Sequence, residues 1–166
     1  MQPVIVAQQR SATSPLAYFL NQLLRPVVDR HVHSTTFMNG SDFMRKLQHY
    51  ANEQHRLRPR TIFAVVTISN FYTMVSHVSM LLVLEGFLND HLCIPAIDNV
   101  SVRRIIELTS LFLESNRFHY DGHIYRCVTG SPTTFPLTET LAMIYIFQWQ
   151  KVLLREESMR EELFGR

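Results

Sequence analysis

The sequence predicts an α+β fold in a single domain, with a small antiparallel sheet packed by helices. Three observations support this class. Residues 61–67 form a β-branched run that is typical of a strand. Asp121 and Gly122 stand between alternating aromatic residues, a pattern typical of a β-hairpin turn. Residues 137–164, after Pro136, keep a helical pattern throughout.

The N-terminal half predicts a short strand, two helices and a second strand. Residues 4–6 are a short β-type run. Ser14 and Pro15 are typical of a helix start, and the apolar residues that follow share one helix face: Leu16, Phe19, Leu20, Leu23 and Leu24. Asn39-Gly40-Ser41 opens a second helix, and a basic loop at 55–60 leads into the strand at 61–67.

The C-terminal half predicts two helices, a hairpin and a long final helix. The two helices are expected near 75–90 and 101–115, and the hairpin at 119–125. Five apolar residues of the final helix are expected on one stripe: Leu137, Leu141, Ile144, Tyr145 and Trp149. Asp42 and Asp121 lie at a helix start and in a turn, so we interpret them as cap and turn residues rather than metal ligands.

Composition limits the classes of protein that need consideration. With 166 residues, 46% apolar and 18% charged, and no repeat or linker, residues 1–166 are expected to form one globular domain. A net charge of +2 and a pI near 8.7 permit a nucleic-acid partner without requiring one. Cys93 and Cys127 lack metal-type spacing and favour reduced thiols. The sequence shows neither a membrane-spanning stretch nor a signal-peptide pattern, so we expect a soluble intracellular protein, nuclear or cytoplasmic.

Residues 61–76, TIFAVVTISNFYTMVS, place Asn70-Phe71-Tyr72-Thr73 directly after the predicted strand. This segment resembles the first palm motif of reverse transcriptases, and most closely that of Penelope-like retroelements. Residues 118–128 resemble the aromatic hairpin before the second palm motif, and 136–150 the helix after it. Residues 23–50 resemble the helical region ahead of the first motif, and the final ELFGR resembles the residues just before the Tyr-x-Asp-Asp hairpin. The resemblance implies a partial right-hand polymerase fold, a fingers and palm segment that stops ahead of Tyr-x-Asp-Asp.

The same resemblance implies where the catalytic and nucleotide-site positions fall. The metal-binding aspartate position is Thr67, whose hydroxyl is a poor substitute for a carboxylate that bridges two Mg²⁺ ions in active relatives. Gln2 stands where the family has a triphosphate-binding arginine, and Thr134-Phe135 stands where it has Gly-Ser. Gly130 is kept, and Tyr72 matches the steric gate against the incoming sugar, although a half-buried aromatic residue at a strand end explains it equally well. We therefore expect no intact catalytic residue and no metal or cofactor bound by this chain.

Three interpretations of function stay open at this stage. In the first, the chain is a reverse transcriptase-like domain whose ancestral reaction is RNA-templated DNA synthesis and which is inactive as it stands. In the second, it is a non-catalytic module that binds nucleic acid or protein. In the third, it is a decaying retroelement copy without function. If an RNA or DNA template-primer is bound, we expect Arg58, Arg60 and Arg126 to contact phosphates. The oligomeric state is not predicted.

Overall fold

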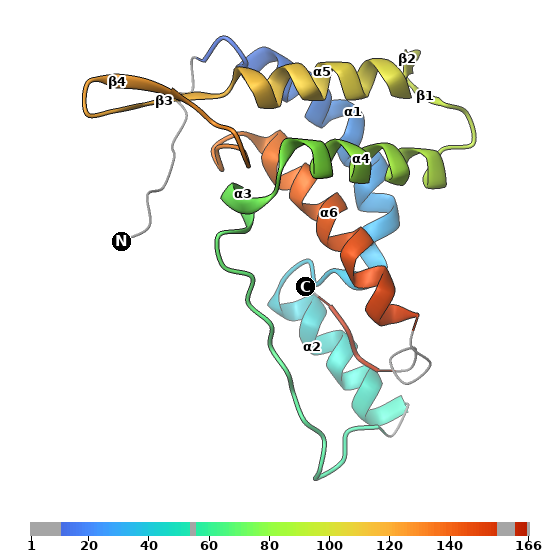
Figure 1. The fold of residues 1–166 in the computed structure, drawn as a ribbon. Coiled ribbons are helices and arrows are strands. Elements are labelled where there is room, and N and C mark those ends of the chain that lie inside the picture. The colour runs from blue at the N-terminus through green and yellow to red at the C-terminus, as the bar shows by residue number, and fades with distance from the viewer. Residues whose placement is uncertain (1–10, 54–55, 156–161, 166) are drawn as a thin grey trace.

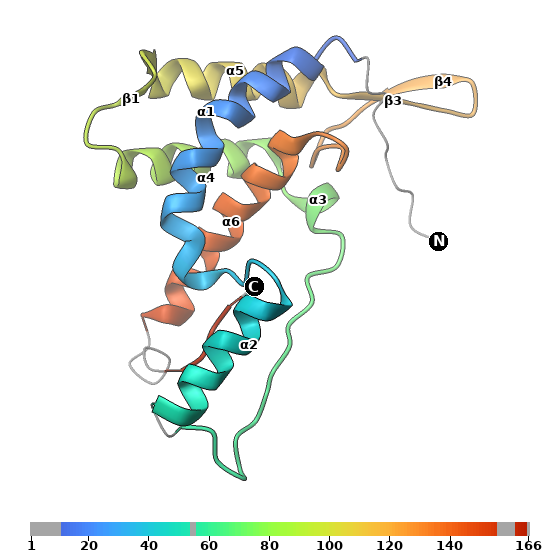
Figure 2. The ribbon, with the colours of Figure 1, turned by 180° about the vertical axis from the view of Figure 1, so that it is seen from behind.

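The computed structural model describes residues 11–53, 56–155 and 162–165. Four helices pack together as its core: α1 (Ser14–Val32), α4 (His77–His91), α5 (Val102–Ser115) and α6 (Pro136–Leu154) (Figures 1 and 2). Two antiparallel hairpins join them, β1 (Ala96–Ile97) with β2 (Val100–Ser101) and β3 (Arg117–Tyr120) with β4 (His123–Arg126). The fold is therefore α+β, as predicted. The strand predicted at 4–6 lies outside the described residues.

Helix α6 runs through the middle of the helical core and contacts α1 on one side and α4 on another. Its buried residues include Leu137, Leu141 and Ile144, as the sequence predicts, but Phe147 is buried as well. Trp149, predicted on the buried stripe, is 51% exposed, so that part of the prediction is wrong. A helix covered on several sides needs apolar residues around most of its circumference, and a single stripe describes it poorly.

The hairpins lie at the edges of the helical core. The β3–β4 turn at Asp121 and Gly122 has φ values of 47° and 75°, so the predicted hairpin is confirmed. This hairpin projects beyond the helices (Figure 1), and none of its residues belongs to the hydrophobic core. The β3–β4 hairpin is therefore not packed by helices, whereas Ile97 and Val100 of the β1–β2 hairpin pack against the helical core.

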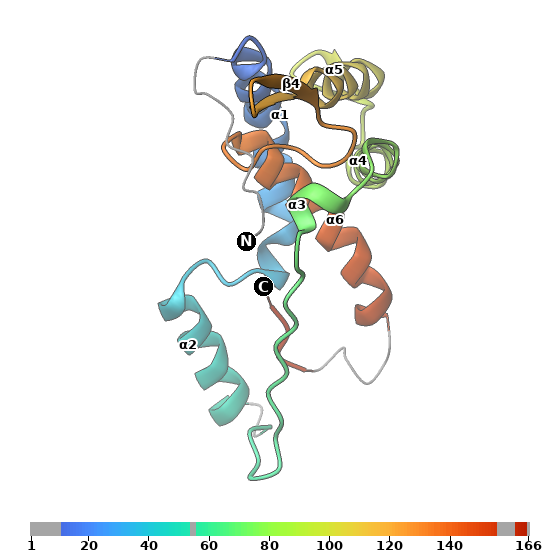
Figure 3. The same ribbon diagram turned by 60° about the vertical axis from the view of Figure 1, so that its left-hand side comes forward.

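Residues 61–67 form no strand in the structure. The prediction of a strand from this β-branched run is therefore wrong. These residues form an irregular segment ahead of the one-turn helix α3 (Phe71–Met74) (Figures 1 and 3). Residues of high β propensity adopt a stable strand only when a neighbouring strand pairs with their backbone. Within the described chain no such neighbour is present.

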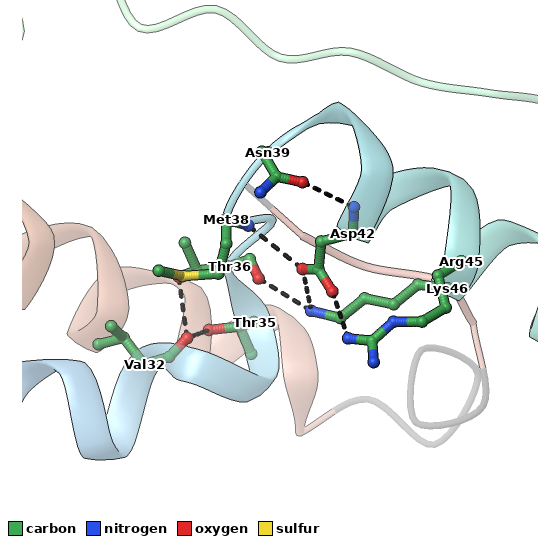
Figure 4. A network of polar contacts seen from close by, with 8 residues as sticks. All are labelled: Val32, Thr35, Thr36, Met38, Asn39, Asp42, Arg45 and Lys46. Carbon is green, nitrogen blue, oxygen red and sulfur yellow. Dashed lines mark hydrogen bonds and ion pairs between the residues drawn. The ribbon is translucent and has the colours of Figure 1, made fainter.

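Helix α2 (Gly40–Gln48) lies away from the helical core (Figure 3), after the short 3₁₀ helix η1 (His33–Thr35), and continues into the π-helical turn η2 (His49–Glu53). Its start is fixed by polar contacts (Figure 4). The Asn39 side chain accepts a hydrogen bond from the Asp42 N–H at 2.9 Å, so the helix opens at Asn39 as predicted. Asn39 is the cap, and the Asp42 carboxylate, interpreted as the cap, instead accepts the Met38 N–H at 3.2 Å. Asp42 in turn binds Arg45 and Lys46, and chiefly the hydrogen bond from Arg45 lowers the pKa of Asp42 to about 2.

The other predicted helices begin within two residues of their expected positions. The hydroxyls of Ser76 and Ser101 cap α4 and α5 by accepting backbone N–H groups from Ser79 and Arg104. In the described part of the chain, no helix has the length and apolar character that crossing a bilayer requires.

Candidate nucleotide and nucleic-acid site

Helix α3 and the loop after β4 bring together two residues that the resemblance places at the nucleotide site. α3 begins after Asn70, which adopts the left-handed conformation at φ 57° and turns the chain toward α6. Phe71 is buried beside Tyr145, with ring centroids 5.7 Å apart, while Tyr72 is 40% exposed. The loop carrying Gly130 lies directly against this turn, so Tyr72 and Gly130 are neighbours.

Backbone hydrogen bonds join the loop to α3. The Gly130 N–H donates to the carbonyl of Val75 at 2.8 Å, and the Ser131 N–H donates to the carbonyl of Tyr72 at 2.9 Å. His77 Nε2 lies 2.9 Å from the Gly130 carbonyl and donates to it. Gly130 has φ 66°, and a Cβ at this position would overlap the Tyr72 carbonyl. Only glycine satisfies both the conformation and the close approach.

A buried polar network holds the other side of this loop. The Asn116 side chain donates to the Ser131 hydroxyl at 3.3 Å, and that hydroxyl lies 2.9 Å from the hydroxyl of Thr138. Thr138 donates to the carbonyl of Pro132 at 2.8 Å. Asn116, Ser131 and Thr138 are all buried, so each hydrogen bond offsets the cost of removing a polar group from water. Neither Asn116 nor Ser131 stands in a recognisable motif, so the sequence did not predict a role for them.

The space between α3, α4, α6 and this loop is small and apolar. It measures about 20 Å³ and is lined by side chains such as Phe71, Val75 and Leu141, together with Tyr72 and Gly130. That volume holds about one water molecule and is far below the several hundred Å³ of a typical small-molecule pocket. As it stands, the cavity does not accommodate a nucleotide, and any sugar contact by Tyr72 would be made on the exposed side of its ring.

The remaining nucleotide-site positions lie elsewhere. Phe135 is buried in the core against Phe112, with ring centroids 5.3 Å apart, and Thr134 is exposed on the surface. Gln2 lies outside the described residues. Thr67 is exposed in the irregular segment, and the described chain holds no cluster of three or more His, Cys, Asp or Glu side chains suited to a metal ion. A single exposed hydroxyl does not fit Mg²⁺, which prefers anionic oxygen ligands.

Three arginines surround an open depression at the opposite end of the molecule. Arg56, Arg58 and Arg60 line it together with Tyr50 and Glu162, and it measures about 630 Å³. A turn presents Arg58 and Arg60, because the Thr61 N–H donates to the Arg58 carbonyl at 2.9 Å and the Thr61 hydroxyl accepts from the Arg58 N–H at 2.8 Å.

The depression also contains a carboxylate. Glu162 accepts a 2.5 Å hydrogen bond from the Tyr50 hydroxyl, which raises the pKa of Tyr50, and lies 3.8 Å from the Arg56 guanidinium. Arg58 and Arg60 are exposed and form no ion pair with any described residue. Two guanidinium groups are thus available to an anion. No sequence motif predicts Tyr50 and Glu162 at this site, and Glu162 lies far from the arginines along the chain.

Arg126 belongs to a different part of the surface. It lies in β4, on the hairpin that projects from the far side of the helical core, whereas Arg58 and Arg60 lie beyond α2 (Figure 1). The three arginines predicted to contact phosphates therefore do not form one patch.

Comparisons of the chain with protein-family models, with curated proteins and with solved structures found no match. The resemblance to reverse transcriptases accordingly stays a prediction that rests on the sequence motifs.

Proposed function

We propose that this chain is a reverse transcriptase-like fingers and palm segment that binds the nucleic-acid backbone and does not itself perform nucleotidyl transfer. The contact between Tyr72 and Gly130 carries the proposal. These residues come from separate motifs of the resemblance, and two backbone hydrogen bonds between α3 and the Gly130 loop hold them together. Their proximity is what a shared nucleotide site would require.

The absence of activity follows from the chemistry at position 67. Nucleotidyl transfer uses two divalent cations that activate the attacking hydroxyl and neutralise the triphosphate. Thr67 supplies a neutral hydroxyl where that reaction needs a carboxylate. We expect no primer extension with Mg²⁺ or Mn²⁺, and template-dependent incorporation that Thr67→Ala abolishes would contradict the proposal.

We assign binding of the sugar–phosphate backbone of the nucleic acid to Arg58 and Arg60. Phosphate contacts fix position and carry little sequence information, so affinity should be similar for different sequences. With two available guanidinium groups, the slope of log K against log salt should be about −2. Arg126, on the far hairpin, should contribute little to the same contact.

The experiment is a titration of labelled RNA–DNA hybrid into the chain at several salt concentrations, starting from about 50 mM. Arg58→Ala with Arg60→Ala should weaken binding and flatten the salt dependence. The matched control is Arg103→Ala with Arg104→Ala, which removes the same charge from exposed positions on α5 that are paired with Glu107. The absence of saturable binding, or equal losses in both double variants, would contradict the assignment.

A second candidate function, a protein-binding module, is favoured by a different observation. The segment between the arginine depression and α3 exposes several large apolar side chains, including Ile62, Val65 and Val66. Exposed apolar residues in such a row are typical of a contact surface.

A further inference from the structure

The backbone of residues 62–69 is unpaired in the part of the chain that the structure describes. Within the described chain, none of their backbone N–H or C=O groups forms a hydrogen bond. The side chains are exposed as well: Ile62 is 88%, Val65 90% and Val66 77% exposed. Backbone groups left without partners and large apolar side chains in water both favour association with another polypeptide strand.

The composition of this segment suits pairing with itself. From residue 61 to residue 70 the sequence TIFAVVTISN has no charge, no proline and no glycine. Short uncharged segments rich in β-branched residues and free of proline are the ones that pair readily with identical segments. We propose that residues 62–69 pair with the same segment of a second copy of this chain, as two antiparallel strands related by a two-fold axis near Val65.

Charge decides the direction of the two strands. Arg58 and Arg60 precede the segment and no acidic residue follows it closely. Parallel pairing in register would place these arginines beside their counterparts. Antiparallel pairing about Val65 places Arg60 of each copy opposite Asn70 of the other, and the two Arg60 residues are then roughly 30 Å apart at about 3.3 Å per residue. That separation exceeds the Debye length of about 8 Å at physiological salt, so repulsion between them is screened.

The available area indicates a weak dimer. Five apolar side chains are exposed along the segment: Ile62, Phe63, Val65, Val66 and Ile68. Their complete burial would remove on the order of 600 Å² per copy, compared with about 800 Å² per partner in a standard stable interface. Pairing of single strands covers only part of that area. We therefore expect a dissociation constant in the micromolar range, near 10–100 µM by order of magnitude.

The segment is also accessible to a second copy. It runs along the outside of the molecule between the α2 region and α3, apart from the four core helices, in all three views (Figures 1, 2 and 3). Ile62, Val65 and Val66 are each more than three-quarters exposed, so little of the described chain covers them.

Sedimentation equilibrium of the full chain over a wide concentration range tests the proposal, together with amide hydrogen exchange at low and high protein concentration. We expect reversible monomer–dimer behaviour and protection of residues 62–69 that rises with concentration. Val65→Lys should abolish the dimer, because Val65 lies opposite its own counterpart at the two-fold axis and the substitution places two positive charges directly across the ladder. Val78→Lys is the matched control, since Val78 is 68% exposed on α4, outside the segment.

Several outcomes would overturn the proposal. These are a monomer at every concentration, a dimer that Val65→Lys leaves intact, protection that does not depend on concentration, or open-ended growth in place of a closed dimer. If Val65→Lys loses its helical circular dichroism, Thr67→Lys replaces it in the same experiment.

Discussion

Gly130→Ala should be among the most destabilising single substitutions in this chain, because Gly130 combines a left-handed backbone with a contact that leaves no space. Its φ is 66°, and a methyl group on its Cα would overlap the carbonyl of Tyr72 and approach the Cα of Thr73. The loop could relieve this overlap only by moving away from α3. That movement would break the hydrogen bonds to Val75 and Tyr72 described above.

The size of the effect can be worked from these parts. A non-glycine residue in the left-handed region costs roughly 1–2 kcal/mol. Each hydrogen bond lost between backbone groups costs about 1 kcal/mol. If both inter-segment hydrogen bonds are lost, Gly130→Ala should lower the free energy of unfolding by roughly 3–4 kcal/mol.

Two other glycines provide matched controls for urea unfolding followed by circular dichroism. Gly122 has φ 75° with open space around it, so Gly122→Ala should cost only the backbone term of roughly 1–2 kcal/mol. Gly86 lies inside α4 with open space as well, and Gly86→Ala should stabilise the protein by about 0.5–1 kcal/mol through helix propensity. If Gly130→Ala costs no more than Gly122→Ala, the loop does not rest on α3 and the argument for a shared Tyr72–Gly130 site is wrong.

The remaining predictions concern titratable and reactive groups. Burial, together with the positive charges of His31 and Lys151, holds the pKa of His91 below its ordinary 6.5. The folded protein therefore favours neutral His91. The stability that this group contributes is complete above pH 6.5 and is lost as the pH falls through the lowered pKa. Urea unfolding between about pH 7 and pH 5 should therefore show a shallower loss of stability in His91→Asn than in the native chain, and equal slopes would contradict this. Burial raises the pKa of the Cys127 thiol, whereas Cys93 is exposed. A thiol reagent near neutral pH should modify Cys93 quickly and Cys127 only after unfolding, as mass spectrometry of digested protein would show.

The sequence predicts this fold best where the causes are local. The start of α2 at Asn39 and the turn at Asp121-Gly122 each depend on residues within a few positions of one another, and both are confirmed. The strand at 61–67 depends on a partner from elsewhere, and without one the β-branched run stays irregular. The exposure of Trp149 likewise depends on which sides of α6 its neighbours cover, which periodicity along one helix does not reveal.

The candidate site divides in the same way. Sequence motifs predict that Tyr72 and Gly130 belong together, and the fold brings them together through hydrogen bonds between distant segments. Phe135 was predicted beside them, yet its ring lies in the hydrophobic core against Phe112, where an apolar side chain is removed from water. Arg126 and Arg58 lie apart because the fold places the β3–β4 hairpin and the turn after α2 on different parts of the surface. The pattern of charges along the sequence does not predict this separation.

The position of helix α2 outside the core affects how cooperatively the chain unfolds. α2 has nine residues, none of them buried, and its contacts are mainly local: the network around Asp42 and the edge-on ring contact of Phe37 with Phe43 at 5.1 Å. Isolated helices this short are marginal in water. We therefore expect α2 to unfold and refold locally while the four core helices remain folded. The free energy of this local unfolding should be small compared with that of the whole chain. The turn at Arg58–Thr61 comes after α2 and η2 in the chain, so we expect local unfolding of α2 to alter the geometry of the arginine depression.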